Sequence, residues 1–267
     1  MRLTLRPVSP RSPLPLGDRD ARFDDAPERE AIEEKIDEQV DRIARLQRKF
    51  YADGRHALLI VLQGRDASGK DGTIRKVFTG VNPQGVEVTS FKVPSELELR
   101  HDFLWRIHDR VPPRGIIGIF NRSHYEDVLV TRVNRIIPKS VWERRYGEIN
   151  DFERMLAASG VAILKFFLHI SRAEQKERLE ERLSDAEKNW KFRAGDLKER
   201  AKWGSYTSAY RDALRRCSTA WAPWYVVPAD DKKVRTLLIA RTIADTLDGM
   251  GLEWPKAEAG VAGMEID

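Results

Sequence analysis

The chain has 267 residues, with 47 Lys+Arg against 42 Asp+Glu and a net charge of +5, which suits one large domain that binds a polyanion. No apolar run approaches the ~20 residues that cross a bilayer, so we expect no membrane segment. The single cysteine, Cys217, excludes an internal disulfide, and the absence of a secretory signal pattern leads us to expect a cytoplasmic protein.

The first two segments differ in their hydrophobic pattern. Residues 1–27 are rich in Pro, Arg and Asp without periodicity, which predicts a flexible N-terminal arm. Apolar residues then recur at steps of three or four between 28 and 51, at Ile32, Ile36, Val40, Ile43, Leu46 and Phe50. This stripe predicts a helix that packs against the body of the protein or against a second subunit.

Short apolar runs alternate with amphipathic ones in the rest of the chain. The strand candidates are 56–63, 85–91, 115–121, 161–170 and 224–229. Three of the intervening helices have a serine followed three residues later by glutamate, the capping-box pattern, at Ser95, Ser140 and Ser171. Strands that alternate with helices predict an α/β fold with a five-stranded parallel sheet between two helical layers, and with ligands at the carboxyl ends of the strands.

The segment 183–206 is crowded with charge and contains Trp190, Trp203 and two glycines, with little periodicity. It is either a solvated connector or a mobile lid, and we favour the lid because it lies between two helical stretches. We therefore expect a domain at 28–255 with a lid at 183–206 and a C-terminal tail at 256–267. Trp105, Trp142 and Trp221 are expected in the core, whereas Trp190 and Trp203 are candidates for stacking on a base.

The stretch "GRDASGKD" follows the first predicted strand and precedes a helix. Its glycines, Gly64 and Gly69, allow successive backbone N–H groups to point at an anion, and Lys70 adds a charge that can bridge phosphate oxygens. In this context the pattern predicts a phosphate-binding loop. The expected phosphate-binding residues of the loop and the first helical turn are Gly64, Ala67, Ser68, Gly69, Lys70, Asp71, Gly72 and Thr73.

Asp71 stands where such loops usually have a Ser or Thr that contacts a metal ion. A carboxylate can replace that hydroxyl as a ligand for Mg²⁺, with Mn²⁺ as an alternative metal. Asp66 and Asp71 are both candidates. We favour Asp66 because it faces the cradle in a loop of this kind, whereas Asp71 lies in the helix start, where it complements the helix dipole.

A second polar cluster follows the strand 115–121, in "NRSHYEDVLV". Asn121 can coordinate a metal ion through its amide oxygen or through a water, and Arg122 is suited to clamp a phosphate chain. Glu126 and Asp127 fit a ligand role or an acidic helix start equally well. A Ser-His-Asp hydrolase is a poor interpretation, because Ser123 directly precedes His124 and no G-x-S-x-G elbow is present.

Several ordered motifs together resemble family-2 polyphosphate kinases over about residues 30 to 255. They are "GRDASGKDGTIRKVF", "GVNPQGVEVTSFKVPSELEL", "FNRSHYEDVLV", "ILKFFLHIS" with "EQKERLEERL", "WKFRAGDLKERAKWGSY" and "APWYVVPA". The resemblance implies a thymidylate-kinase-like P-loop fold with a helical lid. It also implies Mg²⁺-dependent transfer of a phosphoryl group between inorganic polyphosphate and AMP, ADP or ATP, guanine nucleotides being further substrates to test, in a homodimer or homotetramer that binds no nucleic acid.

The resemblance further implies roles for individual residues. Asp66 looks like the catalytic metal-binding carboxylate, Lys70 the loop lysine and Arg122 a phosphate contact, and Arg178 and Arg182 look like the arginines that close on the transferring group. Asn121 stands where many relatives have Asp, which makes Asp127 a possible substitute metal ligand. The implied nucleotide-binding residues are Asn121, Glu126, Asp127, Lys188 and Lys191, and the implied basic groove passes through Lys70, Arg75, Lys76, Arg122, Lys188 and Lys191.

Two other functions fit parts of the sequence. An ATP-dependent nucleotide kinase shares the phosphate loop and lid arginines, and the choice of donor separates it from a polyphosphate kinase. A nucleic-acid-binding protein would explain the basic charge and the seven tryptophans. We place it last because no nucleic-acid-binding motif accompanies the 183–206 segment.

Overall fold

The computed structural model describes residues 3–9, 11–23 and 28–261, and its centre is a five-stranded sheet with the order β2-β3-β1-β4-β5. All neighbouring strands are parallel, which confirms the predicted sheet. The strands are β1 (Ala57–Gly64), β2 (Val86–Ser90), β3 (Ile117–Asn121), β4 (Val161–His169) and β5 (Trp224–Pro228). Each predicted strand therefore exists and ends within two residues of its expected carboxyl end.

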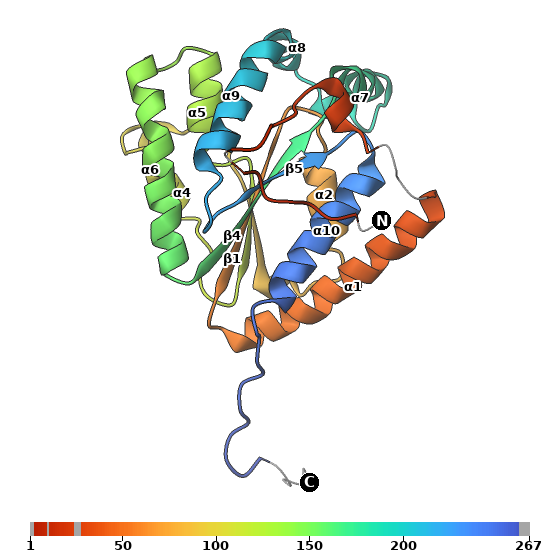
Figure 1. Ribbon diagram of the computed structural model, residues 1–267, viewed down its shortest axis with the longest axis vertical. Helices are drawn as coiled ribbons and strands as arrows, with labels where there is room; N and C mark the ends of the chain where they lie inside the picture. Colours follow the sequence, from red (N-terminus) through yellow and green to blue (C-terminus); the bar gives the residue numbers. More distant parts are fainter. Residues whose placement is uncertain (1–2, 10, 24–27, 262–267) are drawn as a thin grey trace.

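Helices cover both faces of the sheet, as Figure 1 shows. They are α1 (Arg29–Asp53), α2 (Lys70–Val77), α3 (Glu96–Leu99), α4 (Trp105–His108), α5 (Glu126–Val133), α6 (Lys139–Ala158), α7 (Arg172–Ser184), α8 (Ala194–Ala201), α9 (Trp203–Cys217) and α10 (Lys232–Asp248), with short 3-10 turns η1 (Asp18–Ala21), η2 (Pro83–Gly85) and η3 (Asn189–Lys191). None of the helices in the described ranges has the length and apolar character that crossing a bilayer requires.

The central strand β1 explains the three layers. All eight of its residues are buried, because alternate side chains of a strand point to opposite faces and helices cover both. Leu58 and Ile60 pack into the cluster with α1, α2 and α10, whereas Leu59 and Val61 pack into the cluster with α5, α6 and α9. Both cores thus hold β1 in place, and the loop that follows it starts from a rigid strand.

The apolar stripe of α1 packs inside the chain. Its residues Ile32, Ile36 and Ile43 are buried in the cluster that α10 shares. Arg42 adds ion pairs to Asp245 at 2.6 Å and to Asp248 on the same helix. We predicted that this helix packs against the body of the protein or against a second subunit. In the structure it packs against the body.

The three predicted capping boxes have different outcomes. Ser95 and Glu98 form the reciprocal box. Ser171 caps α7 through the Glu174 backbone N–H, but the Glu174 carboxylate bonds to Arg178 instead. The prediction at Ser140 is wrong. The cap residue of α6 is Pro138, which has an extended backbone, and the helix begins at Lys139. Ser140 therefore lies within the first turn of the helix.

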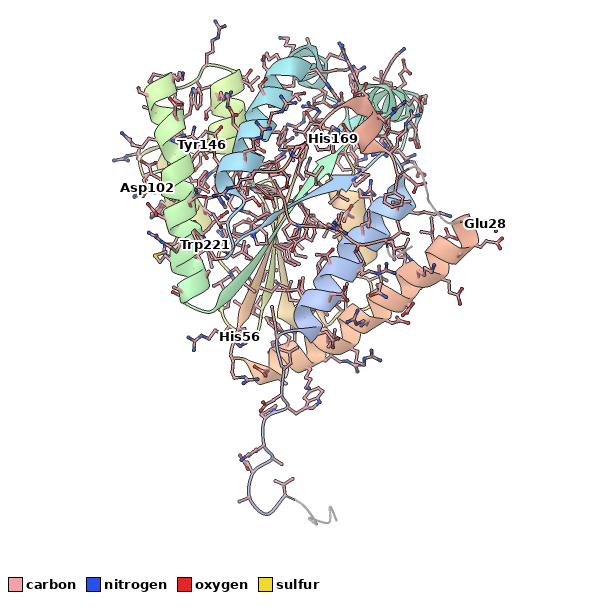
Figure 2. All side chains as sticks on the ribbon, viewed as in Figure 1. Glu28, His56, Asp102, Tyr146, His169 and Trp221 are labelled. Carbon is pink, nitrogen blue, oxygen red and sulfur yellow. The ribbon has the colours of Figure 1, made fainter. Side chains whose placement is uncertain are left out.

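The described part of the N-terminal arm contacts the body of the protein through hydrogen bonds, and its flexibility stays a prediction. The Val8 N–H donates to the Trp224 carbonyl at 2.7 Å on the free edge of β5. Farther along, the Gly17 carbonyl lies 2.8 Å from His169 Nε2 at the carboxyl end of β4. Figure 2 shows His169 in this part of the molecule. The predicted boundary near 27 lies outside the described residues.

The tryptophans are distributed differently from the prediction. Trp105 and Trp221 are 41% and 39% exposed, and Trp142 is partly buried, so the first two are not core residues. Trp105 stacks on His101 at the surface, with 4.2 Å between the ring centroids. The core tryptophan is Trp224, on β5. Cys217 is buried, as expected from its small apolar character.

A buried ionic network lies between β4 and α6. Lys165 Nζ is fully buried and donates to the Glu153 carboxylate at 2.5 Å, to the Tyr125 hydroxyl at 2.7 Å and to the Cys217 carbonyl at 2.7 Å. His124 contacts the other Glu153 oxygen at 3.2 Å. His124 and Tyr125, which follow Arg122 on the β3–α5 turn, are therefore anchored in the core by hydrogen bonds.

Lys165→Met is expected to lower the free energy of unfolding by about 3–5 kcal/mol, because it leaves the Glu153 carboxylate buried without its cation. Urea denaturation measures the change. The matched control is Lys176→Met on exposed α7, which is expected to change stability by less than about 0.5 kcal/mol. A loss below about 1 kcal/mol for Lys165→Met would mean that Glu153 is not held as a charged partner.

Candidate active site

The loop after β1 has the conformation of an anion cradle. Gly69 has a φ of 97°, in the left-handed region, and a Cβ at this position would meet Arg235 Nη1 at 2.2 Å. A Cβ at Gly64 would approach Ser68 Oγ at 2.6 Å. Both positions therefore require glycine, because a side chain would clash with its neighbours. The sequence motif predicted this need for glycine.

Side chains from three helices, α2, α7 and α10, hold the carbonyl groups of this loop. Gln175 donates to the Asp66 carbonyl, Arg178 to the Ala67 carbonyl and Arg235 to the Ser68 carbonyl, while Lys70 Nζ donates to the Gly64 carbonyl at 2.8 Å. The C=O and N–H groups of a trans peptide point in opposite directions. Because side chains hold these carbonyls, the N–H groups of Ala67 and Gly69 point the opposite way, where an anion can accept their hydrogen bonds, whereas the Ser68 N–H donates to the Arg65 carbonyl.

Lys70 is buried at the base of the loop. Burial, followed by the charge of Arg122, lowers the pKa of its ammonium to about 8. A bound phosphate would offset both effects, since it supplies negative charge beside the ammonium. Lys70 is therefore positioned as the predicted phosphate-binding lysine.

Asp66 and Arg122 face each other across the site. Arg122 Nη2 donates to Asp66 Oδ1 at 2.6 Å, and Arg122 Nη1 lies 3.3 Å from the Glu126 carboxylate. The charge of Glu126 raises the pKa of Arg122, although burial opposes this effect, and Asp66 raises it further. Arg122 has a φ of 64°, so the turn after β3 aims its side chain back at the loop.

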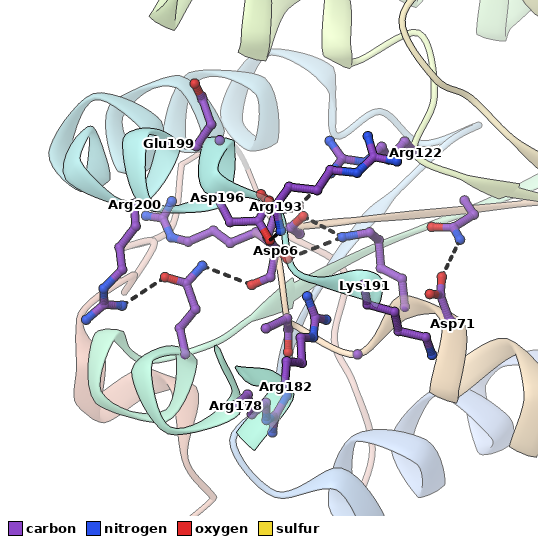
Figure 3. A pocket seen from close by; sticks show the side chains of 18 of the residues that line it. Asp66, Asp71, Arg122, Arg178, Arg182, Lys191, Arg193, Asp196, Glu199 and Arg200 are labelled. Carbon is purple, nitrogen blue, oxygen red and sulfur yellow. Dashed lines mark hydrogen bonds and ion pairs between the residues drawn. The ribbon is translucent and has the colours of Figure 1, made fainter. Parts of the chain in front are cut away.

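Asn121, at the end of β3, reaches α2. Its amide nitrogen donates to the Asp71 carboxylate at 2.6 Å. Asp71 therefore does more than complement the helix dipole, because it connects the two strand ends that carry the site. Figure 3 shows this pair beside the group formed around Asp66.

Three predicted ligand-binding residues point elsewhere. Asp127 does not line the cavity, and its carboxylate accepts from Arg145 Nη1 at 3.0 Å, so the structure argues against a metal or nucleotide contact. Lys76 is on the outer side of α2, where it pairs with Asp37 of α1. Ser68 is fully buried behind the loop. We leave the side chains of these three residues out of the proposed site.

Arg178 and Arg182 lie together on α7, but only Arg178 is strongly engaged. It is 7% exposed and donates to Glu174, to the Ala67 carbonyl and to the carbonyls of Ala229 and Asp230. This set of contacts makes Arg178 a brace for the phosphate loop. Arg182 is partly exposed and lines the cavity, where it is available for a phosphate group.

The segment predicted as a lid forms one wall of the cavity. Lys191, the last residue of η3, and Arg193, the residue before α8, line it. Trp190, the middle residue of η3, is 73% exposed. Lys188 also lines the cavity but pairs with Glu181 and Asp185, both at 2.7 Å. Trp203 carries the Arg65 guanidinium 3.9 Å above its ring, so it stacks on a loop residue in this structure.

The cavity has a volume of about 930 Å³ and is strongly basic. Among the described residues, thirteen lysines and arginines line it against six acids, an excess of seven positive charges in one place. The sequence interpretation missed six of these cations: Arg65, Lys92, Arg193, Arg200, Lys232 and Arg235. Arg65 lies inside the loop motif, and Lys92, Arg193 and Arg200 lie inside other motifs of the family resemblance, so these four could have been found there. No local pattern distinguishes Lys232 and Arg235 from surface charge.

The cavity is also lined by apolar and aromatic side chains. Its lining includes Phe91, Leu129, Tyr206 and Tyr210. A chain of phosphates is bound by cations, whereas a base is bound by flat or apolar side chains. The parallel sheet, the glycine-lined loop and this cavity at the strand ends, lined by both cations and aromatic side chains, define a P-loop enzyme of the kinase type that transfers phosphoryl groups.

Comparisons with known proteins identify the family. The family model of polyphosphate kinase 2 matches residues 26–254. The chain is 55% identical over 217 residues to an AMP/ADP-polyphosphate phosphotransferase of Meiothermus ruber, covering 81% of both chains. It is 46% identical over 240 residues to an ADP-polyphosphate phosphotransferase of Rhodopseudomonas palustris, covering 85% of this chain and 83% of that protein.

A solved structure agrees with this comparison. The crystal structure of polyphosphate kinase 2 from Arthrobacter aurescens matches with a TM-score of 0.86 and 44% identity, over 89% of this chain and 85% of that one. The chain therefore belongs to the polyphosphate kinase 2 family. The resemblance seen in the sequence motifs is confirmed.

Proposed function

We propose that this protein transfers the terminal phosphoryl group of inorganic polyphosphate to AMP and to ADP, and catalyses the reverse reactions. An oxygen of the acceptor's terminal phosphate attacks the last phosphorus of the chain, and the P–O bond to the rest of the chain breaks with its electron pair. The observation that carries the proposal is the excess of seven positive charges around the loop. A long polyanion needs several cations, whereas one nucleotide triphosphate needs few.

The residues fit complementary roles in this reaction. The loop amides and Lys70 hold the phosphates next to the bond that breaks, and Arg122 and Arg182 stabilise the charge that develops on the transferring group. The aromatic and apolar side chains of the lining accept the nucleotide, with Glu126 beside Tyr210. Arg178 supports the loop from behind through the Ala67 carbonyl.

We propose Mg²⁺ as the metal of this site, with Mn²⁺ as a substitute. The Asp66 carboxylate faces the cavity next to the loop, and Mg²⁺ is commonly held by one or two carboxylates together with substrate phosphates. Asn121 would contribute through its amide oxygen or through a water. When bound, the metal would neutralise charge on the phosphates. Asp66 would hold it through its carboxylate, and Arg122 orients that carboxylate.

The choice of donor tests the proposal. Purified protein is incubated with Mg²⁺ and AMP, ADP, GMP or GDP, with either polyphosphate or ATP as the donor, and the nucleotides are separated by chromatography. Formation of ADP or ATP from polyphosphate is the expected result. Efficient transfer from ATP with none from polyphosphate would instead establish the ATP-dependent nucleotide kinase.

The rate is expected to fall at alkaline pH because the pKa of Lys70 is about 8 in the free protein. Below this pH the ammonium is charged and attracts polyphosphate; above it the proton is lost, so kcat/KM for polyphosphate falls about tenfold per pH unit. Lys70→Arg is expected to remove this fall, since a guanidinium stays charged. A decline that persists in Lys70→Arg would assign the titration to another group.

We also propose a cytoplasmic homodimer or homotetramer, on the family resemblance alone. The α1 stripe does not need a second subunit, because α10 already covers it. Light scattering of the purified protein measures the mass in solution. A single 267-residue chain in that measurement would reject the oligomer.

A further inference from the structure

One buried amide links the lid segment to the phosphate loop. Gln175, on α7, is 3% exposed, and its side chain makes a contact at each end. Its Nε2 donates to the Asp66 carbonyl at 2.9 Å, and its Oε1 accepts from Arg200 Nη1 at 2.9 Å. Figure 3 shows this bridge beside Asp66.

The two ends of the bridge belong to functionally different parts. Arg200 lies in α8, within the proposed lid, and also donates to the Arg172 carbonyl at the start of α7. The preceding loop residue, Arg65, is held from the same side, by Thr207 at 2.6 Å and by the ring of Trp203. Residues of α8 and α9 are thus linked to the two residues that lead into the anion cradle: α9 contacts Arg65 directly, and α8 is linked to Asp66 through Gln175.

We propose that Gln175 is a positioning residue that couples the lid helix α8 to Asp66. This inference rests on the proposed function, in which Asp66 acts on the phosphates. The Asp66 carbonyl fixes the peptide between Asp66 and Ala67, and Ala67 has a φ of 63°, a conformation that needs support. By holding this peptide, Gln175 fixes both the direction of the carboxylate and the amide that follows it.

A glutamine suits this coupling because its neutral amide has both donors and an acceptor. Arg200 orients the amide through Oε1, and only then does Nε2 point at the Asp66 carbonyl. A movement of α8 that withdraws Arg200 would free the amide to rotate. Binding of substrate under the lid would in this way change the position of the catalytic carboxylate through the contact between Arg200 and Gln175.

The test is a double-mutant cycle with Gln175→Met and Arg200→Met. Each single variant is expected to lower kcat about tenfold, because each removes the same support of Asp66, and Gln175→Met is expected to keep KM for polyphosphate within about twofold. The double variant is expected to be no slower than the slower single one. Lys176→Met, next to Gln175 but exposed, is expected to match the wild type. Additive losses, or no loss in Gln175→Met, would overturn the proposal.

Amide hydrogen exchange gives a readout that does not depend on activity. Arg200→Met is expected to speed exchange in residues 64–70, although the change lies in the lid, and to have no further effect when Gln175 is already Met. Unchanged exchange in 64–70 would overturn the coupling, and this single variant decides the matter if Gln175→Met does not fold. A wild type that is inactive with polyphosphate would instead reject the proposed function, which the exchange result does not test.

Discussion

Asp66→Asn is expected to lower kcat for transfer from polyphosphate about 1000-fold while the protein stays folded. Asn keeps the size of the side chain but removes the charge that pairs with Arg122 at 2.6 Å and that we propose binds Mg²⁺. The side chain lies at the cavity rather than in either hydrophobic core, so its charge contributes little to stability. Initial rates at saturating polyphosphate and Mg²⁺ measure the loss.

A matched variant separates this effect from a general loss of charge. Asp37→Asn changes an exposed carboxylate on α1 that pairs with Lys76, and it is expected to keep the wild-type rate. Thermal melting by circular dichroism checks the fold of both variants. If Asp66→Asn keeps more than a tenth of the wild-type rate, the essential carboxylate lies elsewhere in the cavity.

Arg122→Lys is expected to lower kcat about 100-fold even though it keeps the positive charge. The guanidinium contacts Asp66 with one nitrogen and Glu126 with the other, and the single ammonium of lysine cannot hold both at this spacing. Loss of this bridge leaves Asp66 without its orienting partner and removes a donor from the transferring phosphate. Steady-state rates with varied polyphosphate separate kcat from KM.

The control for this change is Arg144→Lys, on the exposed face of α6, where the arginine pairs with Glu148. It is expected to leave kcat within about twofold of the wild type. A change in KM alone for Arg122→Lys would show that the arginine only binds the chain. The role proposed for it in the transition state would then be wrong.

The sequence was informative wherever a short pattern has one structural solution. The strands are short runs rich in apolar and β-branched residues between helical patterns, so all five could be located. The loop glycines were equally clear, because Gly69 adopts a φ of 97° that other residues rarely take. Both features depend on neighbouring residues alone.

The acidic pair after β3 shows the limit of such patterns. Glu126 and Asp127 are adjacent, and the sequence did not separate them. Successive residues of a helix point about 100° apart, so α5 directs Glu126 into the cavity and Asp127 toward Arg145. Which of the two faces the site depends on how α5 packs against α6 and α9.

By itself, the sequence determined the parallel sheet, the phosphate loop with Lys70 and Asp66, and the family. The tertiary structure decided which charges converge. Arg200 and Arg235 are far apart in the chain, yet both line the cavity because the last turn of α8 and the first turn of α10 lie at the same edge of the sheet. Charged side chains carry no local signal of burial, so only the packing of helices around the strand ends shows that thirteen cations face one volume.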